Sequence, residues 1–360
     1  MALSLESFED ALARVEGKPK ALLGNGFSIA WSVETFSYPN LRASADFSKL
    51  SCDASGLFDA LRTADFEVVI DRLEAAYAVA SLYDADSAIA ERARQDAEVI
   101  RDALAGALAA SHPDHVGCVA ASSYASARQF LANFEAIYSL NYDLLLYWAT
   151  MHDPEDGLDV PRRDGFDTDP DDEDAPWVTW DMGNAWKQDI HYLHGALHLF
   201  DAGDRIKKLT WIRTDRRILD QIREQLANRV YPLVVTEGSS ADKLTKILHS
   251  AYLSKAFRSF LEKGGDLFIY GHSLAETDDH ILDALASNKF ERIFIGVYGD
   301  PGTPTNRLLM ERGSLLPDRR RRYVEDSDPR RRKGRELTVR FFDAGSANVW
   351  GTDGDKITKA

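Results

Sequence analysis

Four short polar motifs stand where an apolar, strand-like run ends. In chain order they read Gly24-Asn25-Gly26-Phe27-Ser28, Asn141-Tyr142-Asp143, His194-Gly195 and Gly271-His272-Ser273. Glycine lets a backbone approach a ligand closely, and the amide protons at the start of a helix attract anions. Glycine followed by serine after a strand therefore suits a phosphate or a ribose. The motifs therefore predict that a ligand binds where these strands end.

Each motif also has a purely structural interpretation, which the residues alone leave open. A glycine pair after a strand can be a plain turn, Asp143 can cap a helix, and a single histidine such as His194 is often a buried structural residue. The glycine motif departs from the G-x-G-x-x-G fingerprint, and no acidic residue follows on a second strand about 20 residues later. This departure disfavours an ordinary hydride-transfer dehydrogenase.

The elements that must position these motifs alternate between strand-like and helix-like patterns. Strands are expected over residues 21–23, 136–140, 190–193, 232–235, 266–270, 293–297 and 337–342. Such alternation is typical of an α/β protein with a Rossmann-like, doubly wound parallel sheet. In a parallel sheet the carboxyl ends of the strands share one edge, so Asn141 should face a cleft there. His191, His194 and His198 cannot all face it, because side chains alternate along a strand.

A helical insertion is expected over residues 50–130, after the first strand. Two helix-period apolar faces support it: Phe66, Val69, Ile70, Leu73, Tyr77 and Ala80, then Ile89, Ala93, Ala97, Ile100, Leu104 and Leu108. We expect this insertion to pack over the ligand edge of the sheet. A single crossover helix is expected over residues 242–261.

Length and composition limit the classes of protein. The 360 residues carry Lys+Arg 43 and Asp+Glu 58, a net charge of −15, and we expect one domain over residues 1–360. The negative charge makes nucleic-acid binding doubtful. The only cysteines, Cys52 and Cys118, cannot form a four-thiolate zinc site, and we expect no bound metal. Without a signal-peptide pattern or a long apolar run, we expect no membrane span and a cytoplasmic protein.

Two segments have unusual charge. The acidic loop expected over residues 151–189 holds 11 acidic residues between positions 153 and 174, and a role as a lid is one interpretation. The basic loop expected over residues 317–335 has nine basic and three acidic residues between positions 319 and 335. Both compositions are typical of solvated surface loops.

The order of the four motifs resembles the sirtuin superfamily, specifically the bacterial sirtuin-like NAD hydrolases of antiphage defence. The resemblance spans residues 24 to about 278, and Leu140-Asn141-Tyr142-Asp143 and Leu193-His194-Gly195 match best. The chain departs from the protein deacetylases of that superfamily, because it lacks their two cysteine pairs for zinc and the Gly-Ile-Pro-Asp-Phe-Arg-like stretch after the first glycine loop.

The resemblance implies an NAD glycohydrolase that takes NAD as substrate. Asn141 would orient water or the nicotinamide ribose, Asp143 would support Asn141, and His194 would be the base. The implied NAD-binding residues are Gly24, Asn25, Gly26, Ser28, Gly195, Gly271 and Ser273. The resemblance also implies a homo-oligomer and a defence partner such as a HerA-type ATPase. The alternatives are a non-catalytic module that binds NAD or ADP-ribose, and an unrelated doubly wound enzyme such as a nucleoside-type transferase.

Overall fold

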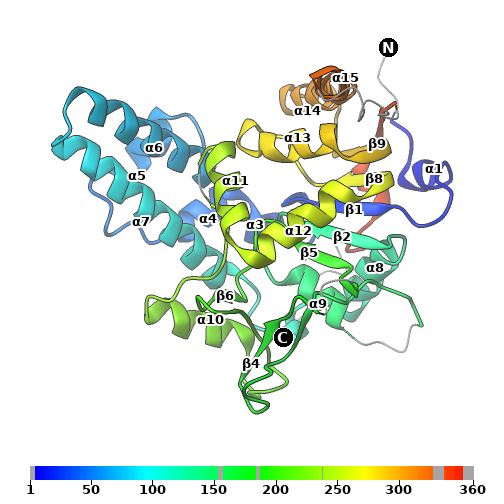
Figure 1. The fold of residues 1–360 in the computed structure, drawn as a ribbon, viewed down its shortest axis with the longest axis horizontal. Helices are drawn as coiled ribbons and strands as arrows, with labels where there is room; N and C mark the ends of the chain where they lie inside the picture. Colours follow the sequence, from blue (N-terminus) through cyan, green and yellow to red (C-terminus); the bar gives the residue numbers. More distant parts are fainter. Residues whose placement is uncertain (1–4, 153–156, 184–186, 237, 327–335, 352–360) are drawn as a thin grey trace.

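A six-stranded, all-parallel sheet forms the centre of the protein. The computed structural model describes residues 5–152, 157–183, 187–236, 238–326 and 336–351 (Figure 1). The strands of the central sheet are β1 (Lys20–Leu23), β2 (Ala136–Ser139), β5 (Ile190–Tyr192), β8 (Gly264–Tyr270), β9 (Lys289–Val297) and β10 (Thr338–Asp343). They are arranged in the order β10-β9-β8-β1-β2-β5. The predicted α/β, Rossmann-like doubly wound fold is confirmed.

Helices cover both faces of this sheet, which explains why its strands are apolar runs rather than alternating patterns. On one face, Phe8 of α1 (Phe8–Leu12) packs edge-on against Phe268 of β8, with ring centroids 5.6 Å apart. On the other face, Phe260 of α12 (Ala251–Glu262) packs against Tyr138 of β2, with centroids 4.9 Å apart. The central strands are therefore buried on both sides.

The strand order creates a switch point between β1 and β8. From β1 the chain proceeds through β2 to β5 at one edge, and then returns to β8 and proceeds outward to β10. The connections that leave β1 and β8 therefore diverge toward opposite halves of the sheet. In open α/β sheets, ligands bind in the crevice that such a divergence opens at the carboxyl ends of the strands.

A helical insertion follows β1, as predicted, but it begins at Gly26 rather than at residue 50. It contains α2 (Gly26–Ile29), α3 (Val33–Phe36), α4 (Tyr38–Ser44), α5 (Ala54–Ala60), α6 (Phe66–Tyr83), α7 (Ala88–Ser111) and the 3-10 helix η1 (Val116–Cys118). Helices α6 and α7 form an antiparallel hairpin that projects from the side of the domain (Figure 1). The next helix, α8 (Ala121–Leu131), packs Phe130 against Phe8 and returns the chain to the sheet.

A second, antiparallel sheet was not predicted. It consists of β3 (Phe166–Thr168), β4 (Trp177–Trp180), β7 (Ile206–Leu209) and β6 (Leu199–Asp201), in that order. The acidic segment expected to be a loop supplies two of these strands. Two of its carboxylates pair with basic residues in or next to β7, since Asp164 contacts Lys208 and Asp169 contacts Arg205. Charge composition alone gave no sign of these pairs.

Three other expectations were wrong. Residues 232–235 form no strand, because Val234 makes only an isolated antiparallel bridge with Gly195. The helix expected over 242–261 is two helices, α11 (Ser240–His249) and α12, because Ser250 starts the second as its N-cap. The described part of the predicted basic loop is helical, in α15 (Leu316–Asp326), and residues 327–335 lie outside the described residues.

The remaining elements complete the layers around the sheet. They are α9 (Leu145–Met151), α10 (Ile218–Ala227), η3 (Glu276–Asp278), α13 (Asp279–Ser287), α14 (Pro304–Ser314) and η4 (Ala344–Ala347). Among the helices that the structure describes, none combines the length and the apolar character needed to cross a bilayer.

Candidate active site

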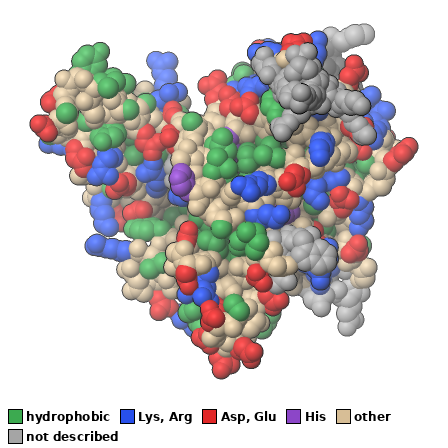
Figure 2. All heavy atoms as spheres, viewed as in Figure 1, with side chains coloured by type: hydrophobic (Ala, Val, Ile, Leu, Met, Phe, Trp, Pro, Cys, Tyr) green, Lys and Arg blue, Asp and Glu red, His purple; other side chains and the backbone are tan. Residues whose placement is uncertain are grey.

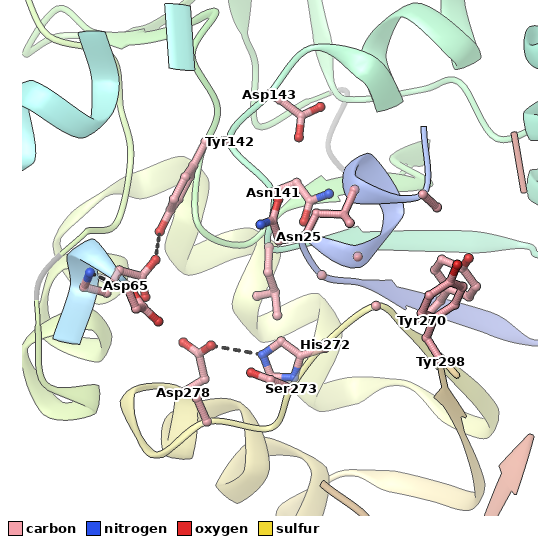
Figure 3. A pocket seen from close by; sticks show the side chains of 18 of the residues that line it. Asn25, Asp65, Asn141, Tyr142, Asp143, Tyr270, His272, Ser273, Asp278 and Tyr298 are labelled. Atoms are coloured by element: carbon pink, nitrogen blue, oxygen red, sulfur yellow. Dashed lines mark hydrogen bonds and ion pairs between the residues drawn. The ribbon is translucent and has the colours of Figure 1, made fainter. Parts of the chain in front are cut away.

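A cleft of about 580 Å³ lies at the switch point, between the loops that follow β1 and β8. Its volume falls within the range of small-molecule and cofactor sites. The base of the insertion lines one side of it, through Glu67 of α6 and Leu108 of α7, so the expected packing of the insertion over the ligand edge is confirmed. Figure 3 shows Asn141 and Asp143 on one side of the pocket and His272 and Asp278 on the other.

Three glycines hold the two loops together. A Cβ on Gly26 would lie 2.4 Å from the Cα of Gly271, and one on Gly24 would lie 2.6 Å from the carbonyl oxygen of Gly271. The N–H groups of Gly24 and Gly26 donate to the carbonyls of Tyr270 and Gly271, at 2.9 and 2.8 Å. Gly24 and Gly26 line the cleft, but these two N–H groups are not free to bind a phosphate, because neighbouring backbone already takes both donors.

The glycine motif instead serves the site through Ser28. Ser28 is fully buried and does not line the cleft. Its hydroxyl donates to Oδ2 of Asp143 at 2.5 Å and accepts from Nδ2 of Asn141 at 3.0 Å. This relay fixes the amide of Asn141, whose Oδ1 is buried without a hydrogen-bond partner. Because Asn141 lines the cleft, that oxygen is an acceptor available to a ligand.

Asp143 lines the cleft and also supports the start of α9. Its Oδ1 accepts from the N–H of Leu145 at 2.8 Å, although Leu144 is the N-cap residue. Burial raises the pKa of Asp143, while the hydrogen bond from Ser28 opposes that rise. The same carboxylate therefore supports the start of α9 and, through Ser28, the amide of Asn141.

His194 lines the cleft as predicted, and it is buried. Its Nε2 lies 3.0 Å from Nε2 of His280, which leaves Nδ1 as the nitrogen for a ligand. Burial lowers the pKa of His194 well below its usual value, although Asp278 opposes this effect. The imidazole is therefore neutral at pH 7, and one of its ring nitrogens carries a lone pair.

The other candidate residues near His194 lie elsewhere. His191 stacks on Tyr138 and His198 packs against Tyr147, which confirms that the three histidines do not share one site. Gly195 has φ +75°, and a Cβ there would lie 1.8 Å from the carbonyl oxygen of Leu233. Gly195 therefore bends the chain behind the cleft and is not one of its lining residues.

A buried ionic cluster that the sequence analysis missed forms the wall opposite Asn141. The ammonium of Lys243 contacts Glu67 and lies 2.9 Å from Oδ1 of Asp278. Nδ1 of His272 accepts from the N–H of Leu274, so its Nε2 carries the proton that is donated to Oδ2 of Asp278 at 3.0 Å. Burial would raise the pKa of Asp278, but Lys243 and His272 hold it well below its usual value.

Asp65 adds a further titratable group to this wall. It lines the cleft and is the N-cap of α6, where its carboxylate accepts from the N–H of Glu67 at 2.9 Å. Burial and the neighbouring Glu67 raise the pKa of Asp65 to about 7. A carboxyl group with such a pKa can donate or accept a proton near neutral pH.

Asn25, Gly271 and Ser273 line the cleft as predicted. Asn25 donates through Nδ2 to the carbonyl of Phe36 at 3.2 Å, which ties the loop to the insertion. Ser273 is exposed at the cleft and follows Gly271, which has φ +71°. The cleft continues over the ends of β9 and β10, where Tyr298 lines it.

His194, Asp278 and His280 are the group of described residues that could hold a metal ion, since their ligand atoms lie within 4.8 Å of one another. Both carboxylate oxygens of Asp278 are already paired, one of them with Lys243 at 2.9 Å. A divalent cation beside that ammonium would be repelled. The charges present therefore fit a hydrogen-bonded network better than a metal centre.

The residues that the sequence analysis missed carried a weak signal. Lys243 stands four residues before Ile247, and both are buried on α11, so a lysine lies on an otherwise apolar stripe. Asp278 stands at the N-cap position of α13, but its carboxylate makes no cap hydrogen bond and pairs with Lys243 instead. Glu67, Lys243 and Asp278 come from three separate regions of the chain, and no local spacing connects them.

The fold and the site define a Rossmann-like α/β protein with a polar, partly buried cleft at its switch point. The chain belongs to the DUF4917 family, a domain of unknown function whose model matches residues 21–350. The match extends from β1 to beyond β10 and so includes the whole cleft. A comparison with curated proteins finds no match.

Proposed function

We propose that this protein is an enzyme that cleaves the bond between nicotinamide and ribose in NAD. The observation that carries the proposal is that Asn141 and His194 line the same cleft at the switch point. Asn141 offers a buried, unpartnered Oδ1 and is fixed by Ser28, and His194 is a buried neutral imidazole. The order of the sirtuin-like motifs supports the same assignment.

The location of the cleft supports a dinucleotide as substrate. The crevice at a switch point is where Rossmann folds bind such ligands, and the cleft reaches from Asp143, near the end of β2, to Tyr298, beyond β9. Ser273 and the side chain of Asn25 provide polar groups along it. The backbone donors of Gly24 and Gly26 have no part in this proposal, because they are used within the protein.

The chemistry that the residues would supply is modest. The C–N bond breaks as nicotinamide leaves with its electron pair, and the ribose develops positive charge. Carboxylates at the cleft, such as Glu67 and Asp278, would stabilise that charge in a partly dry site. Asn141 would orient a water molecule or the ribose. The water oxygen forms the new bond at the ribose carbon, and its proton passes to Nδ1 of His194.

The experiment is incubation of the purified protein with NAD, with nicotinamide release followed by chromatography. His194→Ala and Asn141→Ala should each lower turnover by roughly 10²- to 10⁴-fold. His115→Ala, at an exposed histidine outside the cleft, serves as the matched control. Equal turnover in all four proteins would refute the assignment. A melting temperature that NAD raises in a protein without turnover would favour the non-catalytic NAD- or ADP-ribose-binding module instead.

A further inference from the structure

The two ends of the cleft differ in charge. One end holds the carboxylates of Asp65, Glu67 and Asp278. The other end lies beyond β9 and β10 and is lined by uncharged side chains, which include those of Tyr298 and Asn306. Figure 3 shows Tyr298 on the opposite side of the pocket from Asp65. Because nicotinamide is the positively charged ring of NAD, its place is at the acidic end, and adenine then lies at the uncharged end.

The cleft offers little to hold the phosphates between these two rings. Among the residues that the structure describes, none that lines the cleft is a lysine or an arginine. The N–H groups of Gly24 and Gly26 are used by neighbouring backbone. The first turns of α6 and α9 are already occupied by the carboxylates of Asp65 and Asp143. The base must therefore supply much of the recognition at the uncharged end.

Tyr298 presents an aromatic ring on which a flat base can stack. It lines the cleft and is 75% exposed, so most of its ring is open. The small residues Gly296 and Ala344 line the same end of the cleft. Stacking on an aromatic side chain holds any base, because every base has a π face. Tyr298 therefore provides affinity for a base, and another group has to provide selectivity.

Asn306 of α14 is that group. Its Nδ2 donates to the carbonyls of Tyr298 and Asp300, at 2.9 and 2.8 Å. Since a carbonyl only accepts, these two bonds use both amide protons and fix the direction of the amide. Asn306 lines the cleft, so it can offer a ligand its Oδ1, which only accepts. Adenine carries an amino group that donates, whereas hypoxanthine has at that position a carbonyl oxygen, which Oδ1 repels.

We propose that Tyr298 and Asn306 form an adenine-selective subsite, in which the base stacks on Tyr298 and its amino group donates to Oδ1 of Asn306. This subsite rests on the proposed cleavage of NAD and gives the dinucleotide one direction in the cleft, with nicotinamide at the end that holds Asp65 and Asp278. Neither Tyr298 nor Asn306 contacts the bond that is cleaved.

The first test compares adenosine with inosine, the nucleoside of hypoxanthine, by isothermal titration calorimetry on the full-length protein. Adenosine should bind about tenfold more tightly or better, because inosine places two acceptors against each other. Tyr298→Ala should weaken adenosine binding by about tenfold or more, whereas Tyr298→Phe keeps the ring and should bind adenosine like the wild type. Asn306→Ala should bind the two nucleosides with similar affinity. Circular dichroism checks that each variant folds.

Tyr83→Ala is the matched control for Tyr298→Ala. Tyr83 is 89% exposed and lies outside the cleft, at the end of the α6–α7 hairpin, where Figure 2 shows hydrophobic side chains gathered. Its loss should leave adenosine binding unchanged.

The second test separates this subsite from the proposed reaction. If the wild type cleaves NAD, its KM for the hypoxanthine analogue of NAD should be about tenfold higher or more, and Asn306→Ala should lose this preference. A protein that cleaves no NAD but still prefers adenosine to inosine would refute the proposed reaction and support the subsite. The subsite would be overturned by no binding of adenosine at millimolar concentration, by equal binding of adenosine and inosine, or by wild-type affinity in Tyr298→Ala.

Discussion

Nε2 of His194 lies 3.0 Å from Nε2 of His280, and both rings are buried. Burial lowers the pKa of His280 to about 4 and that of His194 well below its usual value, so both rings are neutral at pH 7. One ring must therefore donate to the other. The chain of contacts continues from Nδ1 of His280 to the hydroxyl of Ser240 at 3.2 Å, and Ser240 is partly exposed. This path connects the cleft with the surface.

The path predicts that His280 positions His194 for proton uptake. His280→Phe keeps an aromatic ring there but removes the hydrogen bond. We expect kcat for NAD cleavage to fall by about 10- to 100-fold, less than for loss of the base itself, while KM changes little. Ser240→Ala should have a smaller effect in the same direction. Because the pKa of His194 is lowered, the acid limb of the wild-type kcat profile should lie below pH 6.5. An unchanged kcat in His280→Phe would contradict this role.

The raised pKa of Asp65 predicts that the stability of the protein depends on pH. Its pKa is raised from 3.8 to about 7 in the folded protein, so between these values the folded state holds a proton that the unfolded state has released. The free energy of unfolding should therefore fall by at most about 1.4 kcal/mol per pH unit as the pH rises through this window. Above the window it should level off.

Asp65→Asn tests this dependence, because asparagine is also a good N-cap but does not ionise. Its stability relative to the wild type should increase between pH 4 and about pH 7, measured by urea unfolding at each pH. A constant difference between the two proteins across this range would show that Asp65 titrates at its ordinary value.

The ammonium of Lys243 is shared by two buried carboxylates, those of Glu67 and Asp278. Lys243→Met leaves both without their cation, which should lower the free energy of unfolding by about 3–5 kcal/mol at pH 7. The loss should shrink at acid pH, where Asp278 can take up a proton. Lys49→Met removes an exposed lysine from the insertion and should change stability by less than about 0.5 kcal/mol. Equal effects of the two substitutions would contradict the buried cluster.

Gly271 and Gly299 form a matched pair for the packing of the loops at the cleft. Their φ angles are +71° and +75°, but a Cβ on Gly271 would lie 2.6 Å from the backbone of Gly26, whereas one on Gly299 meets nothing within 4 Å. Gly299→Ala should cost only the left-handed strain, about 1–2 kcal/mol. Gly271→Ala should cost about 1–3 kcal/mol more through the clash, as measured by urea unfolding. Similar losses would show that the loops can separate without penalty.

Local pattern was enough to predict the layout of the fold. Six of the seven expected strands are strands of the central sheet, because parallel strands buried on both faces are short apolar runs that end in glycine or polar residues. The pair of helices α6 and α7 followed from helical periodicity. The strand expected over residues 232–235 was wrong, because a short apolar run also fits a buried segment that makes a single bridge.

The sequence by itself determined which residues reach the edge of the sheet. Asn141, His194 and Gly271 each follow a strand, and all parallel strands end at the same edge. Only the tertiary structure decided what each residue does there. Gly24 and Gly26 pack against the neighbouring loop, Ser28 supports Asn141, and Lys243 joins Glu67 to Asp278. These contacts join residues far apart in the chain, and burial sets their charges. Neither property is encoded in local spacing.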